Sequence, residues 1–210
     1  MSPPELDTAG GAPPAVYLSM PTYDEALELM HAWTPSESLR RHMYAVEAAM
    51  RAYARRFGED EETWAIAGLI HDFDWEKHPE THPNKGADHL EALGWPAEIV
   101  RAVRAHAPER SGVEPETLME RVLYACDEIT GLITAAVYVR PDRSIHTLTV
   151  KSLKKKFKDK SFARGVDREM VKRGAELLSV ELWEHVGFVL AAMQQEAARL
   201  GLAGAASAQG

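Results

Sequence analysis

The chain has 210 residues, of which 45% are hydrophobic and 27% charged, and its formal net charge is −8. This length fits one domain with a substantial buried core. The acidic balance argues against a stable nucleic-acid partner, because nucleic-acid binding needs a basic face. Cys126 is the single cysteine, which excludes an internal disulfide and fits a reducing compartment.

The first 18 residues are rich in proline, glycine and alanine and contain neither the basic nor the apolar region of a signal peptide. No apolar run approaches the length needed to cross a bilayer. We therefore expect a cytoplasmic protein without a membrane partner.

Capping signals predict three helices in the first third of the chain. Thr22 and Glu25 form a capping box for a helix that reaches about residue 33. Thr34, followed by a proline at the first helical position, is expected to begin a second helix that runs until Gly58. Asp60 caps a third helix, which continues through an apolar segment to residue 72.

Helical periodicity continues through the rest of the chain. Further helices are predicted over about 84–93, 96–107 and 115–139, with two or three more in the C-terminal third, the last over about 180–200. We expect an all-α protein with a single domain over residues 19–202, divided into a core at 36–140 and a C-terminal helical extension at 141–202. The ends, 1–18 and 203–210, are expected to be mobile.

The adjacent pair His71-Asp72 is the main functional signal. It closes the run Ala65 to Ile70, which is apolar on all sides and therefore predicts a buried helix. A carboxylate buried beside a histidine needs a cation or another charged partner. The pair is therefore a candidate metal ligand, and the alternative interpretation is a buried ion pair or a helix-end cap.

Two further residues on other predicted helices point to the same site. His42 lies on a core-facing stripe, with Leu39 three residues before it and Val46 four after. A hydrogen-bonded core histidine is the alternative interpretation. Asp127 stands in the middle of an apolar helical stretch, where a lone aspartate is disfavoured. Ligands that converge from separate helices are typical of metal sites in helical bundles.

The order His42, His71-Asp72, Asp127 resembles the HD superfamily of metal-dependent phosphohydrolases, over about two-fifths of the chain. The resemblance implies an HD-domain helical bundle, with additional C-terminal helices here, and these four residues as metal ligands. In the dinuclear members a second ion is implied, bound here by His82, which precedes Pro-x-x-Gly, and by His106, with Asp72 bridging both ions. His89 competes with His82 for this role.

The resemblance also suggests the chemistry. A divalent transition metal (one or two ions of Mn, Fe, Ni, Co or Zn) suits histidine and carboxylate ligands, and it lowers the pKa of bound water. Asp72 would hold the metal at the reacting centre. Asp74 or Glu76 could accept the water proton or orient the leaving group, and the alternative is that both are solvated loop acids.

A basic segment supplies candidates for binding the substrate. Residues 151–164 carry seven positive charges against one negative charge. Lys154 and Lys155 in this segment, together with Lys85 and Arg140, could bind phosphate. The alternative is an exposed helix whose lysines stay in solvent.

The leading interpretation is therefore hydrolysis of a small phosphorylated substrate, such as a nucleotide, by metal-activated water. One alternative is a di-iron HD-fold oxygenase, and another is a non-catalytic nucleotide-binding HD module. The predicted last helix carries an apolar stripe that could pack internally or against a second copy in a homodimer.

Overall fold

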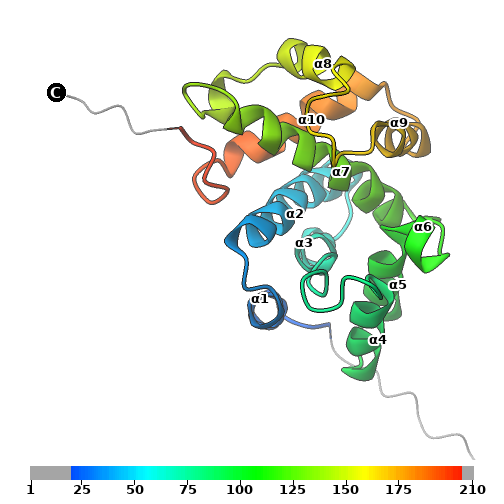
Figure 1. The fold of residues 1–210 in the computed structure, drawn as a ribbon. Helices are drawn as coiled ribbons and strands as arrows, with labels where there is room; N and C mark the ends of the chain where they lie inside the picture. The colour runs from blue at the N-terminus through cyan, green and yellow to red at the C-terminus, as the bar shows by residue number, and fades with distance from the viewer. Residues whose placement is uncertain (1–19, 205–210) are drawn as a thin grey trace, which may run out of the picture.

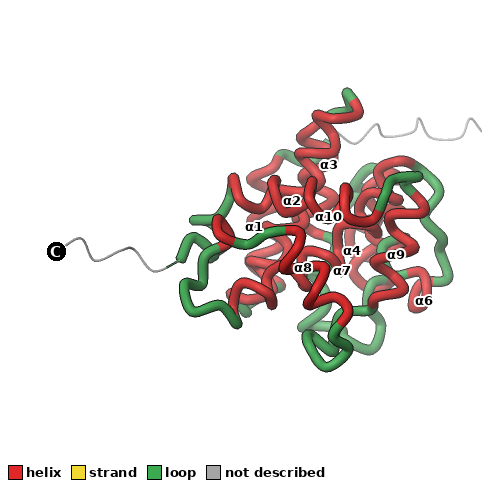
Figure 2. Tube along the Cα trace, turned by 90° about the horizontal axis from the view of Figure 1, so that it is seen from above, coloured by secondary structure: helices red, strands yellow, loops and turns green. Residues whose placement is uncertain are grey.

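The computed structural model describes residues 20–204, and these residues fold into an all-α structure (Figures 1 and 2). The first six helices are α1 (Tyr23–Trp33), α2 (Glu37–Phe57), α3 (Glu61–Ile70), α4 (Asn84–Ala92), α5 (Ala97–Ala105) and α6 (Pro108–Ser111). They are followed by α7 (Leu118–Tyr138), the short 3-10 helix η1 (Ile145–Thr147), α8 (Val150–Lys158), α9 (Arg168–Leu177) and α10 (Leu182–Gln195). The predicted fold class is confirmed.

Helix α7 runs across the middle of the molecule, with α1 to α6 on one side and α8 to α10 on the other (Figure 1). One apolar core joins α2 and α7 to α8, α9 and α10. A second core lies among α1, α3, α4 and α5. Helices α2 and α3 pack together along much of their length, and both contact α7. The arrangement brings the end of α3 close to the centres of α2 and α7.

Helix α3 is the buried helix that the sequence predicted. All of its residues from Trp64 to Ile70 are buried. Gly68 allows its close approach to α2, because a Cβ atom at this position would lie 2.9 Å from the side chain of Met50 and 3.0 Å from the Cα of Glu47. A larger residue would push the two helices apart. The tight contact fixes the position of the C-terminal end of α3 relative to α2, and with it the start of the turn at His71.

The capping predictions are partly correct. Thr22 with Glu25 forms the expected capping box, and Asp60 caps α3 by accepting a hydrogen bond from the Thr63 amide. The prediction that Thr34 begins α2 is wrong, because Ser36 caps that helix. The Thr34 hydroxyl instead donates to the carbonyl oxygen of Phe73 at 3.2 Å, 39 residues away in the chain. The Thr34 hydroxyl, which local spacing had predicted to cap α2, is therefore used in a long-range hydrogen bond instead.

Other differences concern helix ends. The helix predicted over about 96–107 ends at Ala105. Pro108 then lies in the first turn of the short helix α6, as the lack of a proline N–H permits. The last helix ends at Gln195, before the predicted residue 200. The N-terminal segment predicted to be mobile, 1–18, lies outside the described residues. So does the predicted C-terminal tail apart from Ala203 and Gly204, where Ala203 pairs with Ser144 in an isolated antiparallel bridge. Within residues 20–204, no helix is long and apolar enough to span a bilayer.

Candidate metal centre

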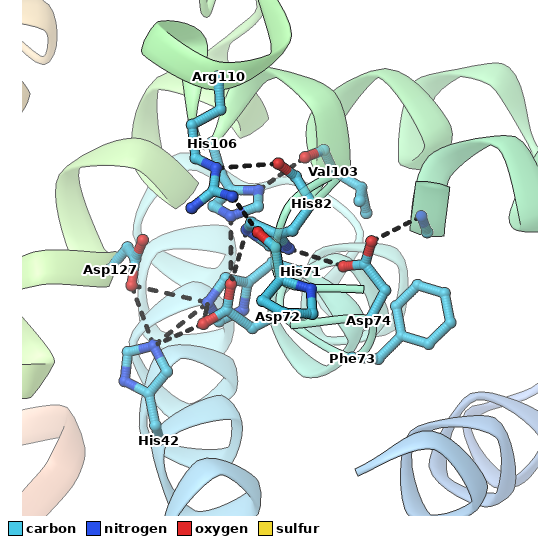
Figure 3. Close-up of polar contacts among 12 residues, drawn as sticks. His42, His71, Asp72, Phe73, Asp74, His82, Val103, His106, Arg110 and Asp127 are labelled. Carbon is cyan, nitrogen blue, oxygen red and sulfur yellow. Dashed lines mark hydrogen bonds and ion pairs between the residues drawn. The ribbon is translucent and has the colours of Figure 1, made fainter. Parts of the chain in front are cut away.

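The structure brings six predicted ligands together at one place (Figure 3). His42 comes from the middle of α2 and Asp127 from the middle of α7, while the others follow helix ends or lie in a loop. They are His71 and Asp72 after α3, His82 in the loop before α4, and His106 directly after α5. Because α2, α3, α5 and α7 pack against one another, residues spread over 86 positions of the chain point into a single space.

One group of ligand atoms surrounds the Oδ2 side of Asp72. The Nε2 atom of His42 lies 3.0 Å from Oδ1 of Asp127 and 3.6 Å from Oδ2 of Asp72. The Nε2 atom of His71 lies 3.6 Å from each of the same two oxygens and 3.3 Å from Nε2 of His42. Four donor atoms, from α2, from α7 and from the turn after α3, therefore face one another across a space that a small cation could fill.

A second group surrounds the other oxygen of the same carboxylate. Oδ1 of Asp72 lies 3.3 Å from Nε2 of His82 and 3.3 Å from Nε2 of His106. These three residues, like His42, His71 and Asp72, have donor atoms within 4.8 Å of one another. Asp72 thus presents one oxygen to each group and lies between them.

Backbone carbonyls fix the orientation of two of the imidazole rings. Nδ1 of His71 is 2.8 Å from the carbonyl oxygen of Gly68, and Nδ1 of His106 is 2.6 Å from that of Val103. A carbonyl oxygen only accepts, so each Nδ1 must carry the donated proton. In the neutral ring, the lone pair is then on Nε2 and faces the site, which is the tautomer that a metal ligand needs.

Side chains fix the other two rings. Nδ1 of His82 donates to Oδ1 of Asp74 at 2.7 Å, again leaving Nε2 to face the site. Nδ1 of His42 lies 3.4 Å from the hydroxyl oxygen of Thr130. Each of the four imidazoles therefore has its outer nitrogen held, and all four present Nε2 to the carboxylates (Figure 3).

The charges of the site interact strongly. Burial disfavours the protonated His71 ring, but the adjacent carboxylates of Asp72 and Asp127 outweigh it and raise the pKa of His71 to about 9. Burial would raise the pKa of both aspartates, yet the neighbouring histidines hold the pKa of each well below its usual range. Without a metal, a proton on His71 thus neutralises part of the carboxylate charge.

The donor set fits divalent transition metals. His71, His82 and His106 are at most 3% exposed, and such rings accompany carboxylates in sites for Mn, Fe, Co, Ni or Zn. Protons on the rings can balance the two partly buried carboxylates, and a cation can replace these protons. His42, His71, Asp72 and Asp127 would hold one ion, and His82 and His106 with Asp72 a second.

A pocket of about 590 Å³ opens onto both groups of ligands. Trp75 and Arg110 are among the residues that line it. The segment between α8 and α9 also contributes to the lining, with Gly165, Val166 and Asp167. Glu128, next to Asp127, also lines the pocket, and burial together with the Asp127 charge raises its pKa to about 7.

The structure does not place the predicted catalytic acids of the loop in this pocket. Asp74 is fully buried and points away from it, with Oδ1 on His82 and Oδ2 accepting from the Gly86 amide at 2.7 Å. Glu76 is exposed and accepts a hydrogen bond from the Ser36 amide at the start of α2. Both acids therefore accept hydrogen bonds from neighbouring parts of the chain and do not line the pocket. This differs from the expectation that one of them accepts the water proton or orients the leaving group.

The four cations predicted to bind substrate also lie outside the pocket lining. Lys85 is exposed on α4, and Lys154 and Lys155 are exposed on α8. Arg140 pairs with Asp142 at 3.0 Å beyond the end of α7. The structure thus does not bring these four side chains to the pocket, because positive charge in the sequence does not show which face of a helix meets the site.

The choice between His82 and His89 is answered by their positions. His89 packs against Trp33, with ring centroids 4.4 Å apart, and does not reach the site, whereas His82 does.

Arg110 lines the pocket and was not among the residues predicted from the sequence. Its only signal was its position four residues after His106, one helical turn further on.

The comparisons with known proteins agree with this geometry. The family model described as HD domain matches residues 39–132, a range that contains all six converging residues. No curated protein and no solved structure matches the chain. The order of the ligands, their convergence and this match lead to one conclusion: residues 39–132 of the chain form an HD domain.

Proposed function

We propose that this protein is a metal-dependent phosphohydrolase that acts on a small phosphorylated substrate, such as a nucleotide. The observation that carries the proposal is the position of Asp72. Its two oxygens face two separate groups of histidines, and both groups open into the same pocket. Two ions held in this way would lie side by side beneath a bound phosphate group.

Divalent ions at this site would lower the pKa of bound water and accept phosphoryl oxygens, which favours hydrolysis near neutral pH. The residues of the chain supply the rigid support for this chemistry. Each ring is held through its Nδ1 atom, and His71, His82 and His106 are buried, so little reorganisation is needed when a ligand binds.

The volume of the pocket supports a small substrate. A space of about 590 Å³ lies within the range of ordinary small-molecule sites. Trp75, Val166 and Met170 give it an apolar portion, beside the polar floor formed by the ligands. A compact organic group fits such a pocket, and the phosphate would face the histidines.

The first test is metal content. We expect purified protein to contain up to two equivalents of a divalent transition metal, and the Asp72→Ala variant to lose both while retaining its helical circular dichroism. Asp88→Ala is the matched control, because Asp88 is exposed on α4 and outside the pocket. A protein that binds none of Mn, Fe, Co, Ni or Zn on titration would refute the proposal.

The second test is a screen of phosphate mono- and diesters with the metal that is found. Release of phosphate or alcohol that disappears in Asp72→Ala supports the proposal. Iron-loaded protein that hydrolyses no ester but consumes dioxygen with an organic substrate would support the oxygenase alternative. A metal-loaded protein that binds nucleotides without turnover would support a non-catalytic module. Either result would contradict a phosphohydrolase.

A further inference from the structure

Arg110 is held rigidly at the wall of the pocket. Its Nε atom donates to the carbonyl oxygen of His82 at 3.0 Å, and one terminal nitrogen donates to that of Pro79. The guanidinium carbon lies 4.9 Å from the centre of the Trp75 ring. The other terminal nitrogen, Nη1, makes no hydrogen bond within residues 20–204. A guanidinium fixed on three sides thus keeps donor capacity for a ligand.

The position of Arg110 ties it to the metal ligands. The carbonyl that it binds belongs to His82, one of the candidate ligands, and Figure 3 shows its side chain beside His82 and His106. The ring of Trp75, on which it lies, meets the His82 ring edge-on at 4.9 Å between centroids. A group bound at the histidines therefore lies within the same small space as this guanidinium.

The other charged residues that line the pocket, apart from the histidines, are acids. Among residues 20–204, Arg110 is the only lysine or arginine that lines it. Glu109, Glu128 and Asp167 line it as well, in addition to the two aspartate ligands. Asp167 uses Oδ1 to cap α9, and Glu128 uses Oε2 to accept from the Asp167 amide, which leaves one oxygen of each without a described partner.

We propose that Arg110 binds a phosphoryl oxygen of the substrate, and that this single cation among acids restricts the site to phosphate monoesters over di- and triphosphates. The inference deepens the proposed function and rests on it for the presence of a phosphate. The organic part of the substrate would face the acidic wall, where hydroxyl or amine donors can meet the free carboxylate oxygens.

The physical reason is charge balance. A guanidinium pairs well with one phosphate, through short charge-assisted hydrogen bonds. Each further phosphate adds at least one negative charge, and the charged residues that line the pocket besides Arg110 and the candidate ligands are three acids, Glu109, Glu128 and Asp167. Of these, Glu109 already lies 3.7 Å from Arg173. Like charges at close range in a partly enclosed site cost affinity. A hydroxyl or amine at the same place gains hydrogen bonds instead.

The test measures binding to the metal-loaded protein, with free metal buffered at a saturating concentration. Calorimetry with inorganic phosphate compares wild type with Arg110→Gln and Arg110→Lys, and metal content is measured in each. Arg121→Gln is the matched control, because Arg121 is exposed on α7 and outside the pocket. We expect Arg110→Gln to weaken phosphate binding by about tenfold to a hundredfold, the typical range for a charged hydrogen bond.

Arg110→Lys separates the two roles that the residue could have. Lysine keeps the charge but cannot hold both carbonyls, so it should recover part of the phosphate affinity if the charge binds the ligand. Unchanged phosphate affinity in Arg110→Gln would overturn the proposal. So would equal loss in both variants together with loss of metal, since Arg110 would then only support the His82 loop.

The second part of the proposal is tested with adenosine monophosphate and adenosine triphosphate under the same conditions. We expect the monophosphate to bind at least about tenfold more tightly, and the reverse order would overturn the restriction to one phosphate. These binding results are independent of turnover. If Arg110→Gln loses phosphate binding but no ester is hydrolysed by wild type, the proposed function fails and this inference stands. If esters are hydrolysed and Arg110→Gln binds phosphate normally, only the inference fails.

Discussion

Replacing Asp74 by asparagine should remove one metal site while leaving the fold almost intact. The carboxylate of Asp74 is fully buried and accepts two hydrogen bonds, each of 2.7 Å, from Nδ1 of His82 and from the Gly86 amide. Both partners donate, and asparagine has a single acceptor oxygen. If that oxygen stays on Gly86, the amide group faces His82 as a donor.

The His82 ring must then accept at Nδ1 and carry its proton on Nε2, the atom that faces Asp72. This is the wrong tautomer for binding a metal. Loss of such an outer partner weakens metal binding by about 10–100-fold, or about 1.4–2.7 kcal/mol. Asp74→Ala would in addition leave the buried Gly86 amide without a partner, at a cost of about 1–3 kcal/mol of stability.

Metal titration by calorimetry measures the expected loss of metal affinity, and thermal unfolding of the metal-free proteins measures the expected loss of stability. Asp74→Asn should show one high-affinity equivalent where wild type shows two, with a melting temperature close to wild type. Asp74→Ala should show the same metal loss and lower stability. Asp88→Asn, an exposed acid on α4, is the control. Two equivalents bound by Asp74→Asn with wild-type affinity would show that the tautomer of His82 does not matter, and the reasoning would be wrong.

Three further results are expected. Gly86→Ala should weaken the same metal site, measured by titration, because a Cβ atom there would lie 2.6 Å from Cγ of Asp74 and 2.8 Å from Cε1 of Phe73. Lys154→Gln with Lys155→Gln should leave kcat and KM for a phosphate ester unchanged, since both lysines lie outside the pocket; a raised KM would contradict this. The metal-free protein should lose stability as the pH rises from about 6.5 through 9, measured by thermal unfolding. The raised pKa of His71 favours the folded state only while the ring is protonated, and saturating metal should abolish the trend.

The sequence predicted the helices well where the signal is local. Capping residues and apolar periodicity depend on neighbours three or four positions away, so Thr22 and Asp60 were assigned correctly. Thr34 was not, because its hydroxyl bonds to the carbonyl oxygen of Phe73, far away in the chain. Local spacing contains no information on such a contact.

Part of the convergence could be anticipated from residues that were unusual for their place, such as Asp127 inside an apolar helix and the pair His71-Asp72 at the end of a buried one. His82 and His106 were expected only from the resemblance to the HD superfamily. Asp74 and Glu76 offered no such contrast. They lie two residues apart in a turn without periodicity, and only the packing of α4 decides that one is buried. The folded structure also explains why the Pro-x-x-Gly sequence has glycine at position 86, since the side chain of Asp74 occupies the space that a Cβ atom would need there.

The basic segment shows why charge alone was a poor guide. Lys154 and Lys155 stay in solvent on α8, but the chain that follows this helix reaches the pocket, which Gly165, Val166 and Asp167 help to line. Arg168 holds this loop by donating to the carbonyl oxygens of residues 159, 162, 163 and 166. The C-terminal helices therefore contribute to the pocket through the loop between α8 and α9, whose backbone is held by the Arg168 guanidinium. The charges within this loop do not indicate that its backbone reaches the pocket, so its position could only come from the folded structure.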